Sequence, residues 1–272
     1  MPRSTEPANA PLSAVRVLPL AHTRQLGQQI YHYLQSTGST NADARELARC
    51  GAPHGTLVVA ETQTAGRGRH DRPWVSPPGL GIYATLLLRP TRIPPGQTPL
   101  LTLLAAVAAA EAIALTVPNL MPVIKWPNDI LVNGRKTAGI LAELTDSHET
   151  APCILIGIGI NVNTPVNRLP ARPLYPATSL AQEAGMHVPR TALLAAYLKR
   201  FEQWLARLEA GDSNALIADW NAWSGIKGKR VSIVQETQTL HGTVTGIDTD
   251  GALRLQTNAN QTTRILSGDL RY

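Results

Sequence analysis

Residues 129–144, DILVNGRKTAGILAEL, carry the clearest structural signal of this 272-residue chain. Asn133 and Gly134 separate two apolar runs, and Asn-Gly in that position is typical of a two-residue β-hairpin turn, because both residues tolerate positive φ. The stretch therefore predicts an antiparallel pair of strands, 129–132 and 135–144.

Further elements follow on both sides of this hairpin. Apolar runs predict strands at 56–61, 81–88, 121–126 and 153–161. Helical spacing with caps or stops predicts helices at 40–51, 98–115 and 190–210, and a short helix through Trp220. From about residue 225 only short strands remain, at 229–234, 239–247, 252–257 and 263–266. This order predicts an α+β domain followed by a small β-barrel.

Composition narrows the class of protein. The formal net charge is +6, and no run of five or more basic residues occurs, so acidic partners are weakly favoured and nucleic acid is not specifically indicated. Cys50 and Cys153 lack a metal-type spacing and fit a reducing, cytoplasmic compartment. The apolar stretch 100–117 is short for a membrane span and is interpreted as a buried helix. Residues 1–19 lack a secretory apolar segment and predict a loose tail.

The register of the hairpin places two charged residues together. The turn pairs Leu131 with Lys136 and Ile130 with Thr137, and because side chains alternate between faces, Asp129 and Lys136 become diagonal neighbours about 7 Å apart at the backbone. An ammonium group beside a carboxylate that takes Mg²⁺ would suit a nucleotide phosphate. An ion pair on an exposed hairpin is the alternative.

Residues 66–74, GRGRHDRPW, place three arginines and a tryptophan beside two glycines. Glycines let backbone N–H groups approach a ligand, and guanidinium forks match carboxylate or phosphate oxygens. The segment, called the arginine loop below, therefore indicates anion binding. RNA contact or a solvated turn would explain the same residues.

Residues 157–161, GIGIN, put Gly157 and Gly159 on one face of a strand and isoleucines on the other. Glycine inside a strand costs roughly 0.5–1 kcal/mol relative to alanine, so two on one face need a reason. A flat ligand or another backbone against that face is the expected reason, and close helix packing is the alternative. Ala138 and Gly139 form a second small pair.

These segments together resemble the biotin protein ligases in order and approximate spacing. They are Ser39-Thr40-Asn41, Gln63 with Gly66-Arg67-Gly68-Arg69 and Trp74, Lys125-Trp126-Pro127-Asn128-Asp129, Lys136-Thr137-Ala138-Gly139-Ile140-Leu141 and Gly157-Ile158-Gly159-Ile160-Asn161. The resemblance implies a class II synthetase-like catalytic domain, α+β with a mixed, largely antiparallel sheet and helices, and an SH3-like β-barrel. It also implies activation of biotin by ATP to biotinyl-5′-AMP, and transfer of biotin to a lysine of a biotin carboxyl carrier domain.

The resemblance assigns roles to individual residues. Implied biotin contacts are Ser39, Thr40, Asn41, Gln63, Gly66, Arg67, Arg69, Trp74, Lys136, Gly139, Gly157 and Gly159. Implied ATP contacts are Arg69, Arg72, Trp74, Lys125, Asn128, Asp129, Lys136 and Asn161. Lys136, Arg69 and Arg67 are the expected catalytic groups, and Asp129 is the expected Mg²⁺ ligand. Helix capping by Ser39 and Thr40 and simple packing of Trp74 are the alternatives.

The arginine loop departs from the family pattern at two positions. Asp71 stands where family loops often have a second spacer glycine, and Pro73 precedes Trp74. Asp71 adds a negative charge and removes backbone freedom, which puts loop closure and retention of the intermediate in question.

Three parts of the chain are expected: a flexible N-terminal tail and lead-in at 1–36, a catalytic biotin- and ATP-binding domain at 37–224, and the SH3-like barrel at 225–272. Fewer than 40 residues precede Ser39, too few for the winged helix-turn-helix of some relatives, so no DNA partner is expected. The expected partner is the biotin carboxyl carrier domain of acetyl-CoA carboxylase or a related carboxylase. No membrane partner is expected, and exposed strand edges allow a homodimer.

Two other functions compete with this interpretation. One is a lipoate or octanoate ligase of the same fold, against which the arginine loop and residues 125–129 argue. The other is a non-enzymatic nucleic-acid-binding protein that uses the basic loop and the barrel, which would bind oligonucleotides with strong salt dependence.

Overall fold

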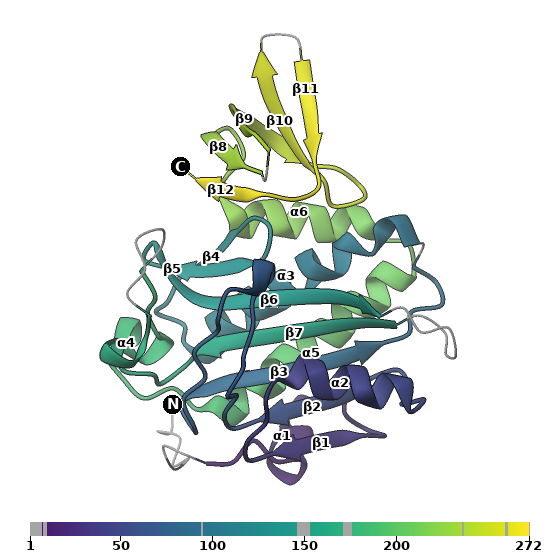
Figure 1. Ribbon diagram of the computed structural model, residues 1–272, viewed down its shortest axis with the longest axis vertical. Helices are drawn as coiled ribbons and strands as arrows, with labels where there is room; N and C mark the ends of the chain where they lie inside the picture. The colour runs from purple at the N-terminus through teal and green to yellow at the C-terminus, as the bar shows by residue number, and fades with distance from the viewer. Residues whose placement is uncertain are drawn as a thin grey trace.

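The computed structural model describes residues 7, 10–93, 95–145, 153–170, 176–235, 237–258 and 261–271 (Figure 1). Seven strands form a sheet in the order β1-β2-β3-β7-β6-β5-β4, in which β1 and β2 run parallel and every other neighbouring pair runs antiparallel. The strands are β1 (Tyr31–Leu34), β2 (Thr56–Ala60), β3 (Gly81–Leu88), β4 (Pro122–Lys125), β5 (Asp129–Val132), β6 (Arg135–Thr145) and β7 (Cys153–Asn161). The predicted fold class, α+β with a mixed, largely antiparallel sheet, is confirmed.

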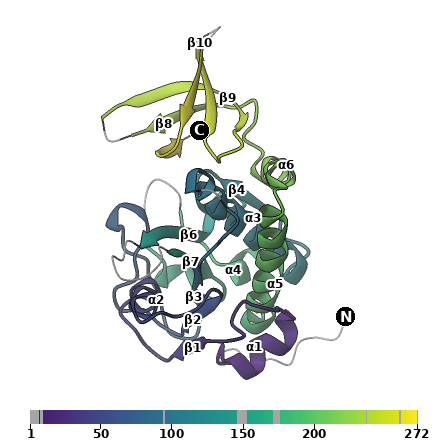
Figure 2. The same cartoon turned by 90° about the vertical axis from the view of Figure 1, so that its right-hand side faces the viewer.

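Helices cover the two faces of this sheet differently (Figure 2). On one face α2 (Thr40–Arg49) packs against β2, β3 and β7. On the other face lie α3 (Pro99–Thr116) and α5 (Arg190–Glu209), with α1 (Ala14–Ala21) beside α5. The remaining helical segments are α4 (Leu180–Ala184), α6 (Ser213–Ser224) and the 3₁₀ turns η1 (Arg69–Asp71), η2 (Pro95–Gln97) and η3 (Val166–Arg168).

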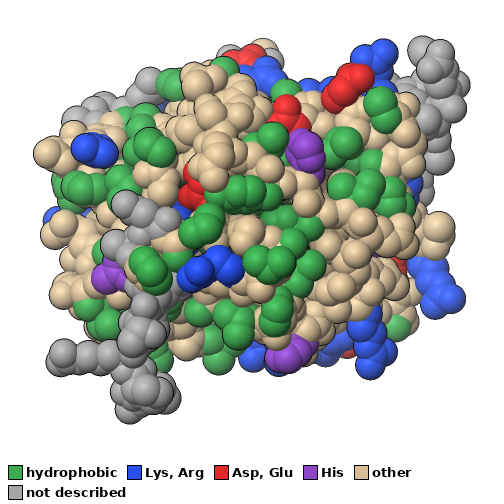
Figure 3. Space-filling view, turned by 90° about the horizontal axis from the view of Figure 1, so that it is seen from below, with side chains coloured by type: hydrophobic (Ala, Val, Ile, Leu, Met, Phe, Trp, Pro, Cys, Tyr) green, Lys and Arg blue, Asp and Glu red, His purple; other side chains and the backbone are tan. Residues whose placement is uncertain are grey.

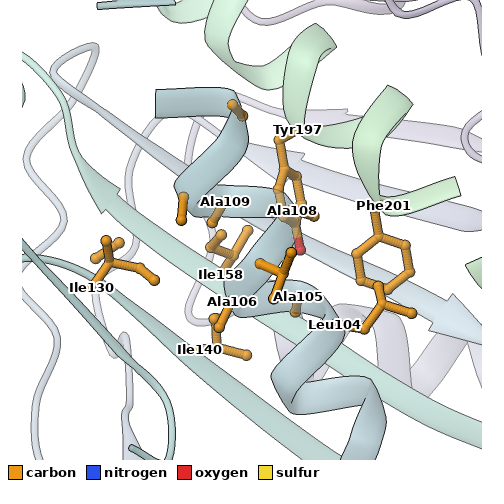
Figure 4. Packing of buried hydrophobic residues seen from close by; sticks show 14 of the residues in the cluster. Leu104, Ala105, Ala106, Ala108, Ala109, Ile130, Ile140, Ile158, Tyr197 and Phe201 are labelled. Atoms are coloured by element: carbon orange, nitrogen blue, oxygen red, sulfur yellow. The ribbon is translucent and has the colours of Figure 1, made fainter. Parts of the chain in front are cut away.

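Helix α3 lies at the centre of the main core, because its alanines let it fit between the sheet and α5. Figure 4 shows these alanines between Ile130, Ile140 and Ile158 of the sheet and the rings of Tyr197 and Phe201 on α5. The helix is long and apolar enough to cross a membrane, yet most of it is buried inside the protein. The prediction of a buried helix is confirmed.

A second, antiparallel sheet of five strands follows α6, in the order β11-β10-β9-β8-β12. It lies beyond α6, at the top of Figure 1. Its strands are β8 (Arg230–Val234), β9 (Thr239–Ile247), β10 (Leu253–Asn258), β11 (Gln261–Ile265) and β12 (Asp269–Arg271). This small sheet, called the C-terminal sheet below, is consistent with the predicted β-barrel.

The prediction of a loose N-terminal tail is wrong for the described residues from Ala10 onward. Helix α1 forms there, and Leu12 is fully buried. The reason is a buried ion pair between Arg190 and Glu61, at 2.8 Å. Arg190 also donates to the carbonyl oxygen of Ala10 (2.6 Å), and Glu61 accepts from the backbone N–H of Leu12 (2.8 Å). The lead-in thus supplies backbone hydrogen bonds to two buried charges, which such charges require.

The predicted hairpin forms, but its predicted register is wrong beyond the second pair. Leu131 pairs with Lys136 as expected, whereas Ile130 pairs with Ala138 and not with Thr137. Thr137 is the extra residue of a β-bulge, and its hydroxyl donates to the carbonyl oxygen of Ile130 at 3.2 Å. The residue pattern does not predict such a bulge, which commonly changes the direction of a neighbouring side chain.

Candidate active site

A pocket opens on the α2 side of the large sheet and collects most of the predicted site residues. Those that line it are Ser39, Thr40, Asn41, Gln63, Arg67, Arg69, Arg72, Trp74, Lys125, Asn128, Asp129, Lys136, Gly139, Gly157 and Gly159. The pocket is also lined by Gly68, Pro73, Pro127, Ile140, Leu141, Ile158 and Asp269, which were not predicted as ligand contacts. Segments far apart in sequence therefore converge on one cavity.

Two predicted residues lie outside this lining. Gly66 is the first residue of the arginine loop; its carbonyl oxygen accepts from the N–H of Trp74 (2.8 Å), and an added Cβ would lie 3.0 Å from the Gln63 amide nitrogen. Asn161 donates to the carbonyl oxygen of Thr178 (3.1 Å) and lines an adjoining recess with Trp74 and Lys136.

One end of the pocket, the neutral end, is built from hydroxyl and amide groups. Thr40 donates its backbone N–H (2.9 Å) and its hydroxyl (3.2 Å) to the amide oxygen of Gln63. Gln63 in turn donates to the hydroxyl of Ser76 at 3.0 Å. Ser39 is the N-cap of α2 and makes no side-chain capping bond, so the capping alternative does not hold for its hydroxyl.

Thr85 and Glu143 hold side chains of the neutral end from outside the pocket lining, and neither was predicted. The Thr85 hydroxyl donates to the amide oxygen of Asn41 (2.6 Å) and lies 2.9 Å from the Thr40 hydroxyl. The Asn41 amide nitrogen donates to Glu143 at 2.6 Å, and Arg45 pairs with the same carboxylate at 3.0 Å. Thr85 lies inside an apolar strand and Glu143 is distant in sequence, so no local signal indicated either residue.

The arginine loop folds as a small hairpin of its own. Gly68 donates its N–H to the carbonyl oxygen of Arg72 (2.8 Å), and Arg67 bridges to Pro73. The tip residues His70 and Asp71 both have positive φ, 55° and 53°. Since a type I′ turn prefers glycine, asparagine or aspartate there, the departure at Asp71 is compatible with the turn.

The other end of the pocket, the cationic end, contains Arg69, Arg72, Lys125 and Lys136 with the carboxylates of Asp129 and Asp269. Lys136 Nζ lies 2.6 Å from Asp129 Oδ1, and Lys125 Nζ lies 3.9 Å from Asp129 Oδ2. The predicted pairing of Lys136 with Asp129 is therefore present, although it is reached through the bulge. The bare surface pair considered as an alternative does not hold, because Asp129 is largely enclosed and lines the pocket.

Burial alters the acid–base properties of this end. Desolvation lowers the pKa of Lys125 from its ordinary value, with Asp129 acting in the opposite direction. Desolvation likewise lowers the pKa of Arg69, opposed by Asp269 and Asp129. Cations that lose hydration without a full set of carboxylates attract an incoming anion more strongly than cations in water.

The predicted glycines Gly157 and Gly159, together with Gly139 of the second small pair, form the floor of the pocket and are called the glycine strip below. A Cβ on Gly159 would overlap the Trp74 indole, and one on Gly157 would overlap the Asn41 amide. Side chains of the protein thus occupy the space that was attributed to a ligand or a backbone. The Trp74 indole nitrogen is buried and has no hydrogen-bond partner among the described residues. Lys136 Nζ lies 5.5 Å from the Trp74 ring centroid, so Trp74 forms part of the pocket wall beside the cationic end.

Comparison with known proteins identifies the family. Residues 33–161 match the biotin/lipoate A/B protein ligase family, and residues 227–270 match the biotin protein ligase C-terminal domain. The chain is 42% identical over 237 residues to the bifunctional ligase/repressor BirA of Bacillus subtilis, covering 87% of this chain and 72% of that protein. The chain belongs to the biotin protein ligases.

Further relatives agree with this family. The biotin--[acetyl-CoA-carboxylase] ligase of Paracoccus denitrificans is 35% identical, with 82% of this chain and 92% of that protein covered. The crystal structure of a biotin protein ligase from Aquifex aeolicus in complex with biotin and ATP superposes with a TM-score of 0.77 at 26% identity, covering 89% of this chain and 98% of that one.

The carboxylates of the pocket fit a magnesium ion that arrives with a nucleotide, and not a permanent metal cage. Within the described ranges, no group of three or more His, Cys, Asp or Glu side chains could hold a metal ion. Asp129 is already paired with two lysines. Mg²⁺ in nucleotide sites commonly takes one or two carboxylates and completes its shell with phosphate oxygens and water.

Proposed function

We propose that this protein is an ATP-dependent biotin protein ligase whose two small substrates, biotin and ATP, use the two ends of one pocket. The observation that carries the proposal is the meeting of the neutral end and the cationic end above the glycine strip. The neutral end suits a cyclic urea, which has two N–H donors and one carbonyl acceptor. The cationic end suits a carboxylate and a triphosphate, which repel each other unless cations lie between them.

In the first half-reaction, a carboxylate oxygen of biotin attacks the α-phosphorus of ATP. The bond from that phosphorus to the bridging oxygen breaks, and pyrophosphate leaves with the electron pair. Lys136 is the bridging cation, since its ammonium group lies beside both Trp74 and Asp129. Arg69 and Arg72 take phosphate oxygens, and Lys125 adds a buried positive charge. A magnesium ion held by Asp129 and the phosphates would neutralise the leaving pyrophosphate.

In the second half-reaction, the ε-amine of an acceptor lysine attacks the carbonyl carbon of biotinyl-5′-AMP, and AMP leaves. The acceptor is a biotin carboxyl carrier domain of acetyl-CoA carboxylase or a related carboxylase. Gly66 and Arg67 belong to the hairpin that shields the anhydride from water. Asn161 serves the nucleotide from the adjoining recess.

The proposal assigns catalysis to residues 37–224 and an SH3-like supporting domain to residues 225–272. We also propose a cytoplasmic location, which the two free cysteines support, and no DNA partner. On the face seen in Figure 3, Lys and Arg side chains are scattered among hydrophobic and neutral ones. Homodimer formation through exposed strand edges remains part of the proposal.

The deciding experiment is biotin-dependent exchange of labelled pyrophosphate into ATP. We expect exchange with biotin and none with lipoate or octanoate. Exchange with lipoate would favour the lipoate ligase alternative. Absence of exchange together with salt-sensitive binding of oligonucleotides would favour the nucleic-acid-binding alternative.

A further inference from the structure

Two contacts tie the arginine loop to the C-terminal sheet. Arg72 Nη2 lies 2.5 Å from Oδ2 of Asp269, the first residue of β12, although the two residues are 197 positions apart in sequence. Arg69 Nη1 donates to the carbonyl oxygen of Gly268 at 3.4 Å. Asp269 also lines the pocket, so the C-terminal sheet contributes a carboxylate directly beside the cationic end.

Local backbone structure places this carboxylate. Gly268 has a φ of +150°, and an added Cβ would lie 2.6 Å from Ile233 and 3.2 Å from the carbonyl oxygen of Val234. A residue with a side chain would therefore push the turn away from β8. Glycine at this position lets β12 start close enough for Asp269 to reach the loop.

Asp269 is the more enclosed partner of this ion pair, and its side chain is only partly exposed. Its side chain is 22% exposed, against 53% for Arg72. Burial by itself would raise the pKa of the Asp269 carboxyl, but the hydrogen bond from Arg72 and the charges of Arg72, Arg69 and Lys125 together lower it. Asp269 is consequently an anion facing three cations of the pocket.

We propose that Asp269 is a positioning residue for ATP, which acts from the C-terminal sheet through Arg72. It holds the arginine loop where the triphosphate binds. An arginine side chain without a partner samples many rotamers. Holding Arg72 in one rotamer before ATP binds reduces the loss of conformational entropy on binding. The inference rests on the proposed function and adds a route by which the C-terminal sheet affects nucleotide use and leaves biotin recognition unchanged.

Comparing ATP with biotin tests the proposal, because neither Asp269 nor Arg72 hydrogen-bonds to the side chains of the neutral end. Thr40 donates to Gln63, and Gln63 donates to Ser76, so removing the Asp269 charge leaves these hydrogen bonds in place. In pyrophosphate exchange by the full-length chain, Asp269→Asn is expected to raise the KM for ATP about tenfold, the ratio that roughly 1.4 kcal/mol of coupling produces. The KM for biotin is expected to stay within about twofold, as for a site distant from the change.

The matched control is Asp248→Asn, which removes a carboxylate from the same C-terminal sheet. Asp248 pairs with Arg264 at 2.7 Å, and it is absent from the residues lining the pocket. This variant is expected to keep both KM values. Asp269→Glu retains the charge and is expected to recover part of the affinity for ATP.

Action through Arg72 is tested by a double-mutant cycle. In the Arg72→Ala background, Asp269→Asn is expected to change the KM for ATP by less than about twofold, because the partner is already missing. An undiminished effect in that background would overturn the proposal, as would an unchanged KM for ATP in the single variant. Equal rises for ATP and biotin would also overturn it, since they indicate damaged folding. If the unaltered protein shows no biotin-dependent exchange, the proposed function itself fails, whatever Asp269 does.

Discussion

The neutral and cationic ends of the pocket differ in how far their polar groups are satisfied within the protein. At the neutral end, hydroxyl and amide groups of Thr40, Gln63 and Thr85 satisfy one another before any ligand arrives. At the cationic end, positive side chains outnumber carboxylates, and burial lowers the pKa of Lys125 and Arg69. The neutral end is organised to select a solute, whereas the cationic end is left short of negative charge, which an anionic substrate supplies.

Removing Lys136 should produce the largest effect of those considered. Lys136→Ala takes away the ammonium group that lies between the glycine strip and Asp129, so pyrophosphate exchange should fall by at least ~100-fold if that charge stabilises the transition state. Lys199→Ala, on the exposed side of α5, is the control and should exchange normally. Near-normal exchange by the Lys136 variant would remove this residue from the mechanism.

Truncation of Gln63 should damage the neutral end selectively. Gln63→Ala leaves the N–H and hydroxyl of Thr40 without their acceptor, and an unsatisfied buried donor costs about 1–3 kcal/mol. The KM for biotin should rise roughly 10- to 100-fold while the KM for ATP changes little. Substrate-titrated exchange assays measure both constants. Equal losses for the two substrates would mean that the two ends are not separable.

Arg69 tests whether the loop retains the intermediate. Arg69→Gly removes a half-buried guanidinium group from the cationic end, so biotinyl-5′-AMP should escape about tenfold faster, as for a lost charge-assisted hydrogen bond of roughly 1.4 kcal/mol. Promiscuous biotinylation of bystander lysines reports the escape. His70→Gly adds the same backbone freedom one residue later and keeps Arg69. Equal labelling by both variants would attribute the effect to loop flexibility and not to the charge.

Substitution of Lys125 should give the smallest effect, and the effect is on the free energy of unfolding. Desolvation lowers the pKa of Lys125 in the folded protein below the ordinary 10.5. Between the folded pKa and 10.5, the unfolded chain therefore binds more protons than the folded protein. The buried charge of Lys125 therefore lowers the free energy of unfolding at neutral pH, and this cost disappears as pH rises from the folded pKa to 10.5. Lys125→Met should change the free energy of unfolding at pH 7 by no more than about 1 kcal/mol, because Asp129 keeps Lys136 as a partner.

The pH dependence separates this cost from simple repacking. Denaturant unfolding of both proteins from pH 7 to pH 10 should show the stability of the unaltered chain rising relative to Lys125→Met. A difference that stays constant with pH would contradict the burial cost. Slower exchange in the same variant would show that the buried charge is kept for function and not for stability.

Much of the fold was predictable, because the decisive signals are local. Asn133-Gly134 defined the hairpin, alternation around Gly157 and Gly159 defined the two faces of β7, and the alanine-rich run defined α3. Strand β1 and helix α1 were not predicted, and neither were helix α4 and strand β12. These elements are short, and a buried ion pair or a neighbouring strand stabilises the first two, so their own sequence carries little pattern.

In the candidate site, too, residues within local motifs were predicted and residues placed by distant partners were not. Motifs supplied fifteen of the residues that line the pocket, because those side chains lie within short, chemically distinctive segments. Thr85, Glu143 and Asp269 could not be found in this way, since each acts through a partner more than forty residues away. The positions of Gly66 and Asn161 outside the main lining were equally inaccessible from spacing alone.

The sequence by itself determined which chemical groups this protein has and roughly which strands and helices carry them, since turn preferences, alternation and helical spacing act within a few residues. Only the tertiary structure decided that Thr137 forms a bulge opposite Ile130, that Trp74 lies on the glycine strip, and that Asp269 reaches Arg72. These contacts depend on how distant segments pack, and packing energy is shared among many residues and is not encoded in any one motif.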